Sequence, residues 1–71
     1  MTRKQLVTTV AAATLATNTP PARVSLAVSE WLSEHPAAGS IFDAAGWDLR
    51  RFVTDVERHR KELATTTRSN P

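Results

Sequence analysis

Five polar side chains share one side of the helix predicted over residues 48–63, and four of them are cationic. At about 100° per residue, they form a strip that contains no carboxylate: Arg50, Arg51, Thr54, Arg58 and Lys61. Cations along a helix face can neutralise consecutive phosphates, and a threonine hydroxyl can hydrogen-bond a base edge or the sugar–phosphate backbone. This basic strip predicts a surface for a polyanion, with DNA as the leading candidate.

The opposite side of the same predicted helix is apolar, which determines how the basic strip must face. Five apolar residues recur there at helical spacing: Leu49, Phe52, Val53, Val56 and Leu63. A stripe of this kind is buried when a helix packs on a core. We therefore expect the basic strip to face solvent.

An alternative interpretation assigns the basic strip to ordinary surface ion pairs. Opposite charges stand at i,i+4 spacing in three pairs: Arg51–Asp55, Glu57–Lys61 and Arg58–Glu62. Such pairs stabilise a helix by roughly 0.2–0.5 kcal/mol each. They account for every base of the strip except Arg50, so on this interpretation the strip is a solvated face without a ligand.

The segment before this helix predicts a helix of barely two turns followed by a tight turn. Ser40 and Asp43 have the spacing of an acidic variant of the capping box, which places the start of the short helix at Ser40. Gly46 stands where a C′ glycine ends a helix, and Trp47 is then placed to pack back on it. Asp48 is the expected N-cap of the long helix.

Short helix, glycine turn and longer basic helix together resemble the helix-turn-helix motif of DNA-binding proteins, over about residues 22–64. The resemblance rests on Ala45-Gly46-Trp47 and implies that the start of the last helix enters the major groove. Phe42, where a small residue is usual, and Asp55, where an apolar one is expected, depart from the pattern. The same outline fits an ordinary helical hairpin. The motif expects four buried positions, at Ile41, Ala45, Trp47 and Phe52.

Prolines mark the helix boundaries in the rest of the chain. A first helix is predicted from Thr2 to about Thr17, a break at Asn18 to Pro21, and a second helix to about His35, where Pro36 ends it. Trp31 falls on the apolar stripe of the second helix and is expected in the core.

The predicted fold is all-α, a small bundle of three main helices and one short helix. One domain covers 1–71, with an N-terminal helix at 1–18, a helical core at 19–64 and a flexible tail at 65–71.

Composition argues against catalysis. The 71 residues include no cysteine and two glycines, and only 15 are Leu, Ile, Val or Phe. The core is therefore thin, no thiolate chemistry is available, and no glycine-rich phosphate loop can form. Asp55, His59 and Glu62 lie on neighbouring turns but lack the second histidine expected of a metal site. We expect no enzyme activity, no cofactor and no metal.

Charge is segregated along the chain. Residues 1–23 carry three bases and no acid, residues 24–49 four acids and no base, and residues 50–71 six bases and three acids. An acidic middle between basic ends favours oriented docking over general polyanion binding.

The lack of cysteine and the length of the apolar segments indicate the cellular location. The lack of cysteine fits a reducing cytoplasm, which is the predicted location, and no apolar segment is long enough to cross a membrane. The alternative is a secretory signal, since Arg3-Lys4 precede an apolar stretch diluted by threonines.

These observations predict a small regulatory binding protein that contacts DNA through residues 40–64. Arg3 and Lys4 would form a basic arm, and the alanine-rich first helix would supply a homodimer surface. The alternative is an adaptor or inhibitor, of the kind encoded in bacterial or phage operons, that docks a helical surface on a larger protein with Trp47 as an anchor. A third class is a small secreted helical protein cut after its first helix.

Overall fold

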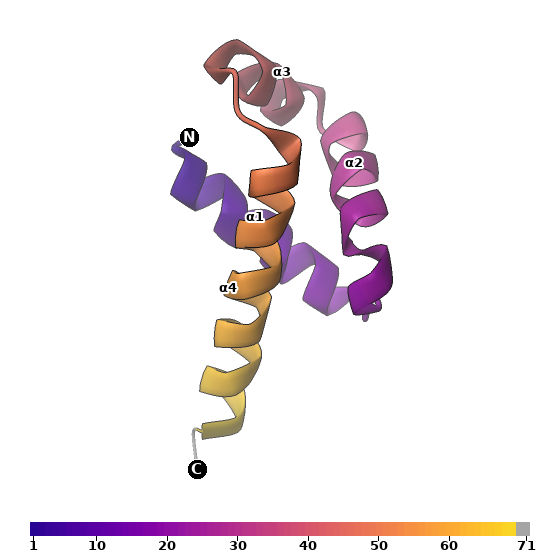
Figure 1. The fold of residues 1–71 in the computed structure, drawn as a ribbon, viewed down its shortest axis with the longest axis vertical. Helices are drawn as coiled ribbons and strands as arrows, with labels where there is room; N and C mark the ends of the chain where they lie inside the picture. The colour runs from indigo at the N-terminus through magenta and orange to yellow at the C-terminus, as the bar shows by residue number, and fades with distance from the viewer. Residues whose placement is uncertain (70–71) are drawn as a thin grey trace.

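The computed structural model describes residues 1–69, with side chains described through Thr65, and within this range its regular secondary structure is helical throughout, with no strand. The all-α prediction is confirmed. The elements are four α-helices and one short 3₁₀ helix (Figure 1): α1 (Arg3–Ala16), η1 (Pro21–Arg23), α2 (Val24–Glu34), α3 (Pro36–Ala45) and α4 (Leu49–Ser69).

The helices form a small bundle in which α4 is the longest member. Figure 1 shows α2 and α4 side by side, α3 lying across one end of the pair, and α1 crossing behind them. The main packing of α1 is against α4, and α2 contacts α1, α3 and α4. No helix in the described part of the chain combines the length and hydropathy that a membrane span requires.

The core draws on all four helices. Phe42 of α3 meets Phe52 of α4 edge to face, with 5.3 Å between ring centroids. Trp31 packs against the core and is partly buried, and its ring stacks on that of His35 at 3.9 Å. The largest fully buried side chains come from α1, α2 and α4: Leu6, Val10, Val24, Val28, Phe52 and Val56.

The first helix is an integral part of this core. Thr2 and Gln5 form a capping box at its start, in which the Gln5 N–H donates to Thr2 Oγ1 at 3.2 Å and the Thr2 N–H donates to Gln5 Oε1 at 2.8 Å. Leu6 and Val10 are fully buried within the chain. The predicted homodimer surface on this helix is therefore wrong for its apolar side, because that side already covers α4.

The start of the third helix was predicted four residues too late. Pro36 occupies the first turn of α3, where its missing N–H and fixed φ suit a helix start. Ser40 is consequently inside the helix and caps nothing. Pro36 both ends α2 and begins α3.

The buried face of α3 also differs from the helix-turn-helix expectation. Ala38 and Phe42, one turn apart, are the buried residues of this helix. Ile41 is 38% exposed and Ala45 is exposed, so the expectation of burial at these two positions is wrong. The register of α3 directs the bulky Phe42 ring, and not Ile41, at the core.

The turn between α3 and α4 matches its prediction. Gly46 adopts a left-handed conformation with φ of 67°. The Trp47 N–H donates to the Phe42 carbonyl at 3.4 Å and the Gly46 N–H to the Asp43 carbonyl at 3.1 Å, which is the Schellman pattern. Asp48 Oδ1 accepts from the Arg50 N–H at 2.9 Å, so Asp48 caps α4 as expected.

The tail predicted from residue 65 is helical through Ser69, and its flexibility stays a prediction. The helix α4 continues through Ser69, and residues 70–71 lie outside the described range. Adding residues to an established helix costs little once nucleation has occurred, and neither glycine nor proline interrupts residues 65–69.

Candidate nucleic-acid interface

The helix α4 separates its two faces as the sequence predicts. Phe52, Val53 and Val56 are buried, and Leu63 packs against the core as a partly buried residue. Leu49, at the start of the stripe, is 39% exposed. All five members of the basic strip are exposed: Arg50, Arg51, Thr54, Arg58 and Lys61.

None of the three predicted i,i+4 ion pairs forms. Within the part of the chain that the structure describes, Arg51, Arg58 and Lys61 have no ion-pair partner. Two of the acids that border the strip are engaged elsewhere, because Asp55 pairs with Arg3 of α1 and Glu62 lies 3.5 Å from His59 Nδ1. The cations of the strip therefore stay available for an external anion.

Arg3 does not lie on a free arm. It belongs to the first turn of α1, pairs with Asp55, and has its guanidinium carbon 5.9 Å from the centroid of the Phe52 ring. A cation over an aromatic face adds a modest attraction. Arg3 thus contributes positive charge to the α4 surface from a fixed position.

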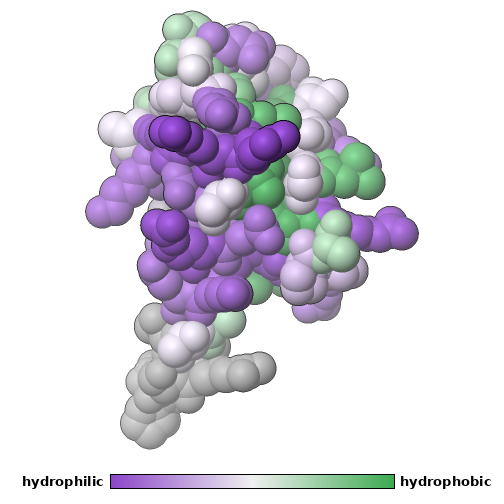
Figure 2. All heavy atoms as spheres, viewed as in Figure 1, coloured by the Kyte–Doolittle hydropathy of each residue, from purple (hydrophilic) through white to green (hydrophobic). Residues whose placement is uncertain are grey.

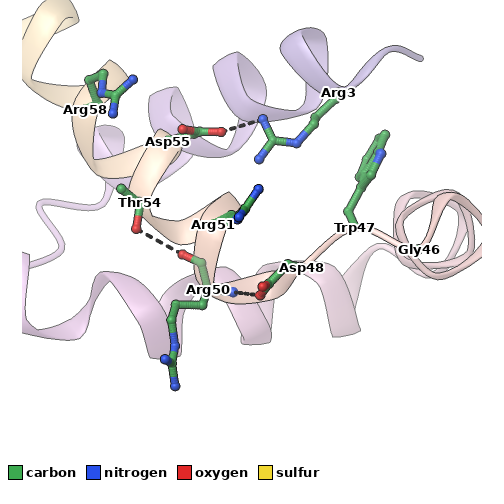
Figure 3. Close-up of a pocket in the computed structure, with 9 residues that line it drawn as sticks. All are labelled: Arg3, Gly46, Trp47, Asp48, Arg50, Arg51, Thr54, Asp55 and Arg58. Carbon is green, nitrogen blue, oxygen red and sulfur yellow. Dashed lines mark hydrogen bonds and ion pairs between the residues drawn. The ribbon is translucent and has the colours of Figure 1, made fainter.

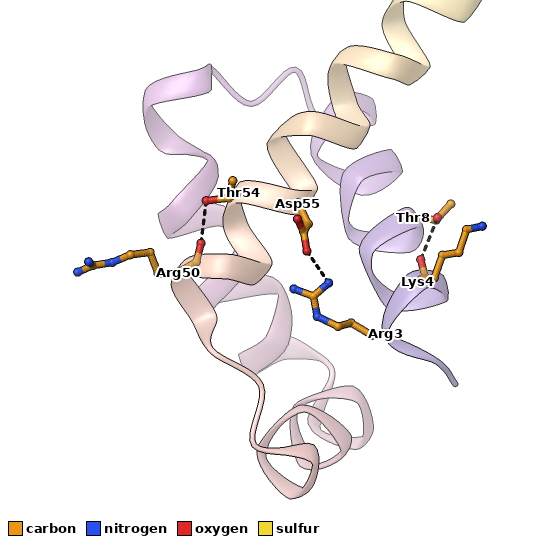
Figure 4. A network of polar contacts seen from close by, with 6 residues as sticks. All are labelled: Arg3, Lys4, Thr8, Arg50, Thr54 and Asp55. Atoms are coloured by element: carbon orange, nitrogen blue, oxygen red, sulfur yellow. Dashed lines mark hydrogen bonds and ion pairs between the residues drawn. The ribbon is translucent and has the colours of Figure 1, made fainter.

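Lys4 follows Arg3 in sequence but leaves the helix on another side. Figure 4 shows its side chain directed away from α4, whereas Arg3 reaches across to Asp55. The Lys4 carbonyl accepts a hydrogen bond from Thr8 Oγ1 at 3.0 Å. The structure therefore does not bring Lys4 together with the basic strip.

An open groove runs along the exposed side of α4, and we call it the α4 groove. Figure 3 shows the Trp47 ring standing at one end and Arg58 lying toward the other, with Arg3 and Arg51 directed toward one another between them. Arg50 extends to the other side of the helix. The groove is lined by nine residues: Arg3, Gly46, Trp47, Asp48, Arg50, Arg51, Thr54, Asp55 and Arg58.

Four arginines and two aspartates give the groove a net positive charge. One aspartate is neutralised by Arg3, and the other is turned to the backbone as the cap of α4. Figure 2 shows hydrophilic side chains gathered over α4 on the face in view, beside a smaller apolar region. Lys61 extends the positive surface one turn beyond Arg58.

The Thr54 hydroxyl is partly committed within the helix. Its Oγ1 donates to the Arg50 carbonyl at 3.0 Å, as serine and threonine often do in helices. The oxygen retains acceptor capacity, so Thr54 is placed to accept a hydrogen bond from a ligand.

Trp47, left open by the sequence, is half-buried and held by two rings. Its ring meets Phe42 edge to face at 5.6 Å and lies parallel to Phe52 at 6.4 Å, with 4° between the planes. The remaining exposed part of the indole lines the α4 groove.

The trio weighed as a metal site does not assemble. Asp55 turns to Arg3, while His59 and Glu62 form a separate pair. Among the residues that the structure describes, no group of three or more His, Asp and Glu side chains could hold a metal ion.

Sequence reasoning missed two long-range interactions of arginine. The Arg3–Asp55 pair joins α1 to α4, and nothing in the local pattern of either residue indicates it. Arg60 Nη2 donates to the Thr19 carbonyl at 2.7 Å, while its buried Nε has no partner. A signal for Arg60 was available, because the helical period places it on the apolar side of α4.

Comparison of the chain with protein-family models, with curated proteins and with solved structures gives no match. The geometry of the α4 groove is therefore the basis on which a function can be assigned.

Proposed function

We propose that this chain is a non-catalytic regulatory protein of the cytoplasm that binds DNA through the basic strip of α4. One observation carries the proposal: the exposed bases of the strip have no intramolecular ion pair within the described part of the chain. Exposed arginines in a row neutralise phosphates and release counterions, which is the main source of affinity for DNA.

The exposed start of α4 after the glycine turn supports this function, although the burial of α3 departs from the helix-turn-helix pattern. The Schellman turn at Gly46 and the cap at Asp48 set the angle between the two helices. In a helix-turn-helix the first residues of the second helix meet base edges. Arg50, Arg51 and Thr54 hold those positions in α4.

The first test is fluorescence anisotropy of a labelled random duplex titrated with the protein at several salt concentrations. About four phosphate contacts predict a slope of log affinity against log salt of roughly −3 to −4. Absence of binding even at low salt would remove the proposal.

Charge reversal locates the surface. Arg50→Glu combined with Arg58→Glu should abolish duplex binding with no change in helicity. Arg58→Glu alone is compared with Arg23→Glu, since Arg23 is exposed in η1, away from the groove, and changes charge by the same amount. Retained binding in the Arg58 variant, or equal loss in both, would contradict the assignment to α4.

A protein partner is the second candidate, and exposed apolar side chains favour it. Leu26 is 56% exposed, and Ile41 and Leu49 are exposed on α3 and α4. Leu26→Ser combined with Leu49→Ser should weaken capture of a protein partner and leave duplex binding unchanged. Unchanged capture of the protein partner would count against this candidate and favour DNA.

A further inference from the structure

One end of the α4 groove combines an aromatic ring with two guanidinium groups. The Trp47 indole stands beside the space into which Arg3 and Arg51 are directed (Figure 3). Arg58 lies farther along the same groove. A flat apolar surface next to two neighbouring cations matches the two parts of a nucleotide, its base and its phosphate.

The ring and one of the cations are already held in place. Phe42 and Phe52 fix the orientation of Trp47, and the ion pair with Asp55 positions Arg3. Groups fixed before binding lose little conformational entropy when a ligand arrives. The groove is open to solvent and has a volume of about 770 Å³, a size comparable with the roughly 300–1,000 Å³ of sites that hold small organic ligands, so it has room for one nucleotide.

We infer that the α4 groove takes an unpaired nucleotide of the DNA, with its base stacked on Trp47 and its phosphate between Arg3 and Arg51. The next phosphate along the strand then lies toward Arg58. A base inside an intact duplex has both faces covered by its neighbours and cannot stack on a side chain. The protein therefore prefers DNA that contains a single-stranded stretch, an inference that rests on the proposed DNA binding.

The test compares three labelled DNAs of equal length in the same buffer: a full duplex, a duplex with a central gap of a few nucleotides, and a single strand. Stacking of one base contributes about fivefold or more in affinity, so the gapped and single-stranded DNAs should bind at least about fivefold more tightly than the duplex. Trp47→Leu should remove this preference, and Trp47→Phe should retain most of it. Circular dichroism checks that each variant is folded.

A second readout does not depend on replacing Trp47. In a Trp31→Phe background the only indole is that of Trp47, because the chain has two tryptophans. A base stacked on it should quench its fluorescence when the single strand binds, and an abasic strand of the same length should not.

The possible outcomes distinguish failure of the nucleotide site from failure of DNA binding itself. Tighter binding of gapped DNA with quenching supports both. Equal, salt-dependent binding of all three DNAs without quenching overturns the nucleotide site and leaves DNA binding intact. Absence of binding to any of the three at low salt overturns both.

Discussion

Asp55 lies within the α4 groove, between Arg58 and its ion-pair partner Arg3 (Figure 3). Its carboxylate holds Arg3 in position, but it also places a negative charge where a phosphate would bind. These two effects oppose each other for an anionic ligand. The effect of removing the Asp55 charge on ligand binding depends on whether Arg3 stays in the groove without its ion-pair partner. The Phe52 ring beneath the guanidinium helps to keep Arg3 there.

Asp55→Asn should therefore strengthen DNA binding by several-fold at low salt. The substitution removes a like charge from the phosphate path and releases Arg3 from its ion pair. The loss of stability should stay below about 1 kcal/mol, since both side chains are about one-third exposed. Anisotropy with duplex and gapped DNA measures the effect, and Asp43→Asn on α3 is the control of equal charge. Weaker binding of the Asp55 variant would show that the ion pair, and not the freed cation, is what the ligand needs.

Arg60 has a structural function that its neighbours on α4 lack. Its guanidinium joins the loop after α1 to α4 through the Thr19 carbonyl. Arg60→Met keeps much of the apolar stem and should still cost about 1–2 kcal/mol of unfolding free energy, because it leaves a partly buried carbonyl without a donor. Urea unfolding compares it with Arg58→Met, which removes an exposed side chain and should change stability little. Equal unfolding curves would contradict the function assigned to Arg60.

At the scale of the element, the turn at Gly46 determines how α4 leaves α3. Apart from the chain neighbours of Gly46, no heavy atom lies within 4 Å of a Cβ built on it, so a substitution there meets no steric barrier from the rest of the fold and tests the left-handed backbone. Gly46→Ala should destabilise the fold by about 1–2 kcal/mol. Gly46→Asn should cost less, since asparagine tolerates this conformation. Thermal unfolding by circular dichroism distinguishes them, and an alanine variant as stable as the parent would show that the turn does not constrain the helices.

Local chemistry explains what the sequence predicts well at this scale. The faces of α4 follow from its helical period, and the turn follows from Gly46 and Asp48, whose effects act within a few residues. Pro36 was harder to interpret, because proline both ends one helix and suits the first turn of another. The expected burial of Ile41 came from the helix-turn-helix pattern, whereas the face that α3 buries is decided by its packing in the fold, which directs Phe42 inward.

At the scale of the whole molecule, the candidate site depends on how α1 packs, which the sequence pattern does not determine. Arg3 and Asp55 are far apart in the sequence, and only the crossing of α1 over α4 brings them together (Figure 1). Such a contact has no periodic signal in the sequence, unlike the basic strip. Four of the five groove residues on α4 were predicted as binding residues, the exception being Asp55, and Arg3 of α1 was predicted to lie on an arm.

Because α1 crosses α4, the small core of the protein also depends on the side chains that α1 buries. Leu6 is fully buried, so Leu6→Ala should cost about 2–5 kcal/mol, most of what a core of this size supplies. The melting temperature should fall by about 10 °C or more, and DNA binding should weaken at temperatures where the variant unfolds. Leu26→Ala removes the same atoms from a side chain that is 56% exposed and should melt almost as the parent does. If the two variants melted alike, α1 would not be part of the core, and the position of Arg3 in the α4 groove would lose its support.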